Sequence, residues 1–317
     1  MVVKLRRLAL LALLLVLFLT FLDNTVVSVA LANVQTSLSA GVTSLQWVVN
    51  GYALVFASLM LAFGTIGDLV GRKKVMLAGA AVFCAGSVLA ALAPNVDVLV
   101  AGRAVMGLGA AASEPGTLSM LRHIYEGREE RARALGLWAA VSGLALAAGP
   151  LVGGVLVGLW SWRGIFWFNL AFGLIALVIG IIVLPETSDP VARRFDFPGL
   201  VLGTVAIAAT VFAVMQAETN GFRAFWVPIL FAVGVLSLIG FVLLERTAAN
   251  PILNVRYFRR PSFVAANVVA FSGYFALFSV FFFVALYLQE VGTSSGYGTA
   301  LVFVPLAAAM IVASVLA

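Results

Sequence analysis

The sequence predicts an all-α polytopic membrane protein. Of its 317 residues, 63% are hydrophobic and only 10% are charged, and the mean hydropathy is +1.13. A soluble globular chain of this length carries about 25% charged residues. Apolar runs of about 20 residues, the length that crosses the hydrocarbon core, can be placed ten times along the chain. We therefore expect helices that span a membrane repeatedly.

Each predicted span is an apolar run bounded by charged, Gly or Pro residues. The ten ranges are 8–32, 46–66, 75–93, 97–121, 133–158, 163–184, 197–216, 225–244, 262–288 and 297–317. Spans one to six have short connections. A longer segment with two prolines and several charges, residues 185–196, follows them and marks a boundary. The segment 250–263 is basic and amphipathic, as expected of an interfacial stretch.

The basic residues orient the chain. Sixteen of the 19 Lys and Arg residues fall at the N-terminus or in even-numbered loops, and only Arg163 and Arg223 fall in odd-numbered ones. By the positive-inside rule the N-terminus is cytoplasmic. The net charge of +6 therefore reflects membrane orientation. Because the basic residues are dispersed and no aromatic residues interleave with them, we expect no nucleic-acid binding.

Three ionisable residues lie well inside predicted spans, where charge is costly and usually functional. At ~1.5 Å per residue, Asp23 in span one lies about 22 Å from the cytoplasmic side and Arg103 in span four about 27 Å. Their similar depths predict an ion pair. Glu114 follows Arg103 by 11 residues, so both face one side of the helix about 16 Å apart.

Proton exchange is the functional interpretation of these three residues, because a buried carboxyl group beside an arginine is suited to take up and release a proton. Two structural alternatives remain. The pair of Asp23 and Arg103 could simply fix helix register, and Glu114, next to Pro115, could be a carboxyl group at a helix kink that reaches the cytoplasmic interface.

The loop between spans two and three carries the most specific pattern, Gly64-Thr-Ile-Gly67-Asp68-Leu-Val-Gly71-Arg72-Lys73-Lys74. We expect its three glycines to form a tight turn, since glycine adopts positive φ without penalty. Arg72 and Lys73 should lie at the head-group level, where an anionic leaflet attracts each by about 1 kcal/mol. Asp68 can cap a helix start or pair across a moving seam.

This spacing resembles the loop between helices 2 and 3 of the major facilitator superfamily of secondary transporters, although Leu69 stands where that family usually has a basic residue. Further segments are similar to motifs of one branch, the fourteen-span drug:proton antiporters. They are Leu22–Leu31 in span one, Leu99–Ala111 in span four, and the antiporter motif in span five, with Gly143, Gly149, Pro150, Gly153 and Gly154.

The resemblance implies two six-helix bundles separated by two linker spans. Residues 1–190 would form the N-terminal bundle, 191–248 the linker helices, and 249–317 the incomplete start of a second bundle, truncated after about ten spans. Asp68, which in that family contacts a helix of the second half, should then find only local donors or solvent. We expect the 317-residue product to insert in the membrane without transporting.

The function implied is proton-coupled export of amphipathic, often cationic drugs or toxic metabolites from the cell (inner) membrane, by alternating access of a monomer. The chain lacks the phosphate-binding loop of ATPases, Cys/His clusters with metal spacing and an identifiable Ser/His/Asp set, so we expect no enzyme, cofactor or metal, and a proton gradient as the energy source. The alternatives are a facilitator or importer of a polar metabolite on the same fold, and a non-transporting membrane sensor or truncated product.

Overall fold

The structure, a computed structural model, describes residues 2–188, 196–248, 251–290 and 305. Its elements follow one another as α1 (Val2–Val26), η1 (Val27–Ala30), α2 (Leu31–Leu38), α3 (Val42–Val70), α4 (Arg72–Ala91), α5 (Val96–Ile124), α6 (Arg128–Leu159), α7 (Arg163–Val183), α8 (Phe197–Asn220), α9 (Trp226–Thr247), η2 (Val255–Arg259) and α10 (Pro261–Glu290).

Each of the nine ranges predicted between residues 8 and 288 is helical in the structure. Within the described residues, eight segments are long and apolar enough to cross a membrane, and they correspond to the first eight predicted spans. The tenth prediction, 297–317, lies outside the described residues except for Pro305. Several helices extend past the predicted apolar core. One example is α6, which begins at Arg128, because Glu129 and Glu130 suit the positive end of a helix dipole and can remain in water.

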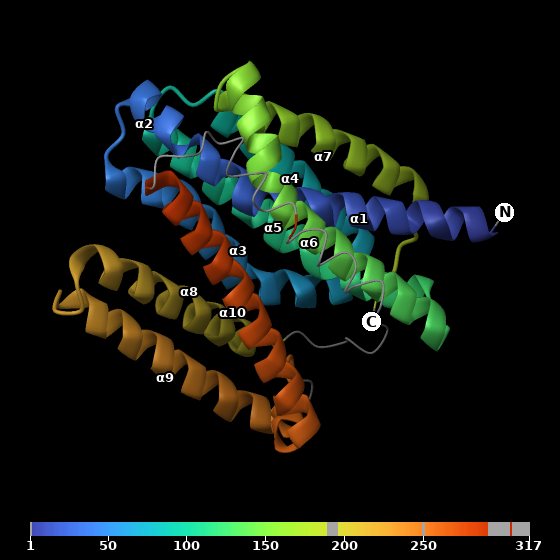
Figure 1. Cartoon of the computed structure of the whole chain (residues 1–317). Coiled ribbons are helices and arrows are strands. Elements are labelled where there is room, and N and C mark those ends of the chain that lie inside the picture. The colour runs from blue at the N-terminus through green and yellow to red at the C-terminus, as the bar shows by residue number, and fades with distance from the viewer. Residues whose placement is uncertain (1, 189–195, 249–250, 291–304, 306–317) are drawn as a thin grey trace.

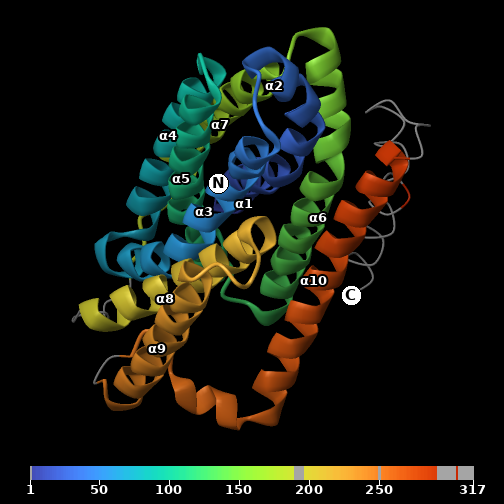
Figure 2. The same ribbon diagram turned by 90° about the vertical axis from the view of Figure 1, so that its left-hand side faces the viewer.

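The first six spans form one bundle. Figure 2 shows α4 lying along α5 and α1 packed between α6 and α7, while α3 contacts α5. In Figure 1, α8 and α9 run side by side apart from this bundle, where α8 packs on α3 and α9 packs on α8. After η2, α10 runs beside α6 (Figure 2).

Small residues bring α4 and α5 into close contact. A Cβ at Gly86 would lie 2.7 Å from the backbone nitrogen of Met106, and a Cβ at Gly102 would lie 2.8 Å from the nitrogen of Ala90. In a membrane, where lipid is as apolar as leucine, such close backbone approach is a main source of helix association. This seam fixes α5, the helix that carries Arg103 and Glu114.

The first span is interrupted in its C-terminal third. The helix tightens into η1 at Val27–Ala30 and continues as α2 to Leu38, beyond the predicted end at residue 32. Thr25 and Ser28 turn their hydroxyls back to carbonyl oxygens of the preceding turn, Leu22 at 3.3 Å and Thr25 at 2.6 Å. Such hydrogen bonds compete with the helix ladder and bend helices. The interruption begins at Val27, four residues after Asp23.

Candidate functional site: a buried charged cluster

Asp23 and Arg103 form a buried salt bridge, as their depths predicted. Arg103 on α5 donates from Nη1 to Asp23 Oδ2 on α1, and the two side chains are 1% and 0% exposed. The guanidinium also donates from Nε to the carbonyl oxygen of Val48, at 2.9 Å. Its Cζ lies 4.5 Å from the centre of the Tyr52 ring, within cation–π range. The arginine thus links α1, α3 and α5.

A third helix reaches the same carboxylate. Asn169 on α7 is fully buried, and its Nδ2 donates to Asp23 Oδ1 at 2.7 Å. Both oxygens of Asp23 therefore accept a hydrogen bond from a different helix. We call Asp23, Tyr52, Arg103 and Asn169 the charged cluster. A buried ion pair is retained only when such additional bonds satisfy its remaining polar atoms, since desolvation of each ion is expensive.

Glu114 lies apart from this cluster. In the described part of the chain its Oε2 is buried and has no hydrogen-bond partner. Arg103 and Glu114 both lie on α5, and their common face stays a prediction. The structure gives Glu114 no ion pair within the described residues.

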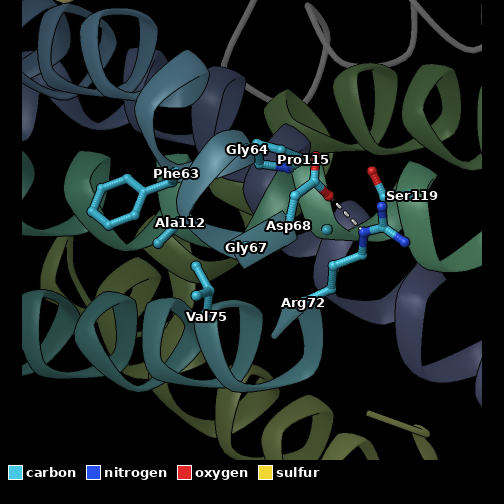
Figure 3. Close-up of a pocket in the computed structure, with 10 residues that line it drawn as sticks. Phe63, Gly64, Gly67, Asp68, Arg72, Val75, Ala112, Pro115 and Ser119 are labelled. Atoms are coloured by element: carbon cyan, nitrogen blue, oxygen red, sulfur yellow. Dashed lines mark hydrogen bonds and ion pairs between the residues drawn. The ribbon is translucent and has the colours of Figure 1, made fainter. Parts of the chain in front are cut away.

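The loop between α3 and α4 turns at a single residue, which corrects the prediction that three glycines form the turn. Gly71 has φ +127°, whereas Gly64 and Gly67 lie inside α3. A Cβ at Gly64 would be 3.6 Å from the Pro115 side chain, so this glycine lies close to α5. Figure 3 shows Gly64, Gly67 and Pro115 around a small pocket that Asp68 and Arg72 also line.

Asp68 finds a local donor. Its Oδ1 accepts from Arg72 Nε at 2.7 Å, a pair four residues apart that joins the last turn of α3 to the first residue of α4 (Figure 3). Of the two roles that the sequence left open for Asp68, a helix cap or a pair across a moving seam, the structure gives the bond to the first turn of α4 to another residue. Glu186, from the segment after α7, accepts from the backbone nitrogen of Lys73 at 3.1 Å.

Hydrogen bonds join the end of α7 and the segment after it to the loop between α3 and α4. Lys73 Nζ donates to the carbonyl oxygen of Ile181 at 2.8 Å, and the nitrogen of Arg72 donates to the carbonyl oxygen of Thr187, also at 2.8 Å. A Cβ at Gly71 would lie 2.7 Å from Glu186 Oε1. Gly71 is therefore required both by its positive φ and by the room that Glu186 occupies.

The glycines of the span-five motif divide between two roles. Gly149 and Gly153 lie against the bent part of α1, where a Cβ at Gly153 would be 2.7 Å from the carbonyl oxygen of Val26. Pro150 is buried within α6, and Gly154 is half-buried. Gly143 instead lines a cavity of about 270 Å³ between α6 and α10, which Ala139, Ser142, Leu146, Val269, Ala270, Gly273 and Tyr274 also line.

We expect Gly149→Ala to destabilise the bundle by about 1–3 kcal/mol, the usual cost of overpacking a filled interior. The new methyl group would meet Thr25 Oγ1 and lie 2.9 Å from Thr25 Cβ. It would also disturb the hydrogen bond from Thr25 Oγ1 to the carbonyl oxygen of Leu146. Thermal unfolding of the purified protein in detergent measures the effect.

The matched control is Gly158→Ala on the same helix, where a Cβ would meet no atom within 4 Å. Because alanine favours helix by about 1 kcal/mol over glycine, this variant should be as stable as the parent or slightly more so. Equal melting temperatures for the two variants would contradict the packing role of Gly149.

Sequence reasoning missed three residues of these sites, namely Tyr52, Asn169 and Glu186. A signal for Asn169 existed, because it is the one amide in the otherwise apolar run from Gly164 to Val183. An isolated polar side chain in a membrane helix usually faces the bundle interior. Tyr52 and Glu186 carry no comparable signal.

Comparisons with known proteins place this geometry in context. The family profile described as Major Facilitator Superfamily matches residues 13–317. The Methylenomycin A resistance protein of Bacillus subtilis is 37% identical over 93% of the chain and 63% of its own length. The Multidrug resistance protein Stp of Mycobacterium tuberculosis is 35% identical over 94% of the chain and 56% of its own length. The chain thus spans between half and two thirds of these relatives.

Solved structures agree at the level of the fold. The crystal structure of the peptide transporter POT in complex with sulfate is similar with a TM-score of 0.59 at 17% identity, covering 96% of the chain and 68% of that protein. At this identity the likeness supports the arrangement of helices alone.

Proposed function

The chain belongs to the Major Facilitator Superfamily, and from that membership we propose that the protein it represents is a proton-coupled exporter of amphipathic, often cationic compounds. The proposal applies to the complete protein, since the chain spans 56% of the length of one relative and 63% of another. The names of these relatives, which refer to multidrug and methylenomycin A resistance, support export of toxic compounds.

The buried charged cluster is the observation that supports proton coupling. Asp23 is a carboxylate with no solvent exposure, held by donors from α5 and α7 inside a multi-pass bundle. Ionisable groups inside membrane spans are costly, and they commonly form proton relays in transporters. Protonation of Asp23 removes its negative charge, which weakens its attraction to Arg103 and frees α1 to move relative to α5.

Alternating access then follows from a two-state element. In the deprotonated state Asp23 and Arg103 join α1 to α5, and a proton taken up from one side of the membrane biases the bundle toward the other state. Glu114, on the same helix as Arg103 and with a buried carboxyl oxygen that has no partner among the described residues, is the proposed second carboxyl group on this path. A ligand or proton shifts such an equilibrium only by its differential affinity for the two states.

We assign the protein to the fourteen-span branch on the arrangement of α8 and α9. These helices pack on one another and, through α8, on α3. This position outside the first bundle suits linker helices, as proposed for residues 191–248. The bias of basic residues supports a cell-membrane location with the N-terminus in the cytoplasm.

The cavity between α6 and α10 favours amphipathic cargo over a polar metabolite. Of its eight lining residues, Ser142 and Tyr274 carry polar side-chain groups and the others are Gly, Ala, Val and Leu. Pockets for apolar ligands are lined in this way, with a few placed polar groups that orient the ligand. A facilitator of a polar metabolite would need more hydrogen-bonding groups here.

The test expresses the complete protein in a host that lacks its main efflux pumps and follows a cationic dye such as ethidium. We expect lower dye retention than in the same host with empty vector, and restored retention when a protonophore collapses the gradient. Retention equal to the empty-vector control across several cationic and neutral dyes would contradict export.

A further inference from the structure

The side chain of Asn169 is half satisfied. Its Nδ2 donates to Asp23 Oδ1 at 2.7 Å, while its Oδ1 is buried and, within the described residues, has no hydrogen-bond partner. The residue itself is fully buried on α7. Buried polar atoms are hydrogen-bonded in the great majority of cases, so an orphan acceptor beside an ionisable group calls for an explanation.

The chemistry of Asp23 offers this oxygen a donor in one of its two protonation states. A carboxylate only accepts hydrogen bonds, whereas a carboxylic acid must also donate one. Arg103 has only donors, so it suits the charged carboxylate. It cannot accept a hydrogen bond from the O–H group of the neutral acid. The Asn169 carboxamide carries two donor hydrogens on one side and an acceptor oxygen on the other. Of the two groups bonded to Asp23, only Asn169 can therefore serve both forms.

We propose that the Asn169 carboxamide reverses when Asp23 takes up a proton. Rotation by about 180° about the Cβ–Cγ bond exchanges Nδ2 and Oδ1, because the two ends of the amide occupy nearly the same shape. The new O–H bond on Asp23 Oδ1 then donates to Asn169 Oδ1. The proton comes from the transport pathway, and no other bond is made or broken. This inference rests on the proposed function of Asp23.

The reversal gives the two partners of Asp23 different roles. Arg103 on α5 loses an ion pair when Asp23 is neutralised, so its hold on α1 weakens. Asn169 on α7 keeps one hydrogen bond to Asp23 in either state. Helix α1 would thus remain attached to α7 while its link to α5 changes with each proton. Asn169 is a positioning residue, because it orients Asp23 without exchanging protons itself.

The surroundings limit which other groups contribute. Among the described residues, Arg103 from α5 forms the ion pair with Asp23, and the ring of Tyr52 from α3 packs against the Arg103 guanidinium. Glu114 on α5 has a buried carboxyl oxygen without a partner in this part of the chain. The Tyr52 hydroxyl is 3.3 Å from the carbonyl oxygen of Thr20, to which it donates. The orientation of the amide is therefore coupled mainly to the charge on Asp23.

The test compares two substitutions in the complete protein, reconstituted in liposomes. Asn169→Leu keeps a similar volume without a donor or acceptor, and Asn169→Ser offers one hydroxyl that can do either. We expect Asn169→Leu to lower proton-driven dye efflux about tenfold, because one hydrogen bond to a charged group is lost, and Asn169→Ser to lower it less than about threefold. Asn24→Ala is the control, since that amide bonds the Thr20 carbonyl oxygen within α1 and should change efflux less than about twofold.

A second readout separates positioning from mere structural support. This readout is downhill dye flux, measured without a proton gradient in the Asp23→Asn variant. Adding Asn169→Leu to that variant should change the flux less than about twofold, because the two residues act as one unit. In infrared difference spectra, the C=O band of protonated Asp23 should move to higher frequency in Asn169→Leu as its hydrogen bond is lost. If the leucine variant fails to accumulate, Asn169→Ala takes its place in both measurements.

The outcomes separate the role of Asn169 from the proposed function of Asp23. Three outcomes would overturn the role of Asn169 and leave the proposed function of Asp23 standing. They are wild-type efflux in Asn169→Leu, an unmoved carboxyl band, and a loss of downhill flux as large as the loss of driven efflux. Undiminished proton-driven efflux in Asp23→Asn would overturn the proposed function, and this inference with it.

Discussion

Replacing Asp23 by asparagine is expected to abolish proton-driven efflux by the complete protein while it still inserts and folds. Asparagine has nearly the same volume, and its oxygen can still accept from Arg103. It carries no exchangeable acidic proton, so substrate movement can no longer be coupled to the gradient. Dye efflux from vesicles energised with a pH gradient measures the loss, which should reach the level of vesicles without the protein.

Asp97→Asn provides the control for this substitution. Asp97 is exposed in the first turn of α5, the helix that also carries Arg103. Its neutralisation should leave efflux unchanged, because an exposed charge at a helix start is worth about 0.3–1 kcal/mol. Undiminished efflux in the Asp23 variant would exclude this carboxyl group from coupling.

Replacing Arg103 by alanine should have the largest effect on stability, about 3–5 kcal/mol, because it leaves a buried carboxylate without its cation. Arg103→Lys should cost less, since it keeps the charge but cannot bond Asp23 and the Val48 carbonyl oxygen together as the guanidinium does. Thermal unfolding in detergent gives both values. Equal melting temperatures for the alanine variant and the parent would contradict a buried pair.

A double substitution distinguishes a register-fixing pair from a coupling pair. Replacing both Asp23 and Arg103 by leucine removes both buried charges, and apolar replacement of a buried pair is often neutral or stabilising. We expect stability close to that of the parent and no proton-driven efflux. Recovery of efflux in this variant would support the purely structural alternative for the two residues.

The sequence predicted the helices and the central ion pair because both follow from strong local signals. Runs of about 20 apolar residues determine where the chain can cross lipid. The pairing of Asp23 with Arg103 followed from depth alone, since two opposite charges at similar heights have few other ways to lower their cost. Glycines in membrane helices allow close packing, and the structure places Gly149 and Gly153 against Thr25 and Val26.

Other features depend on contacts that no local pattern reveals. Glu186 reaches Lys73 across 113 residues, so its capping role could not be inferred from the segment around it. Gly64 and Gly67 were wrongly placed in the turn, because glycine is common inside membrane helices as well as in turns. Asn169 was overlooked because a neutral amide in a span is less costly, and therefore less conspicuous, than a charge.

The measurement that tests proton-coupled export most directly follows protons and cargo in the same preparation. Everted vesicles containing the complete protein are energised so that their interior becomes acidic, and a cationic amphipathic dye is then added. Proton-coupled export predicts that dye addition partly dissipates the pH gradient with the parent protein and leaves it unchanged with Asp23→Asn. Dye transport that leaves the gradient untouched in the parent, or dissipates it equally in both proteins, would contradict the account.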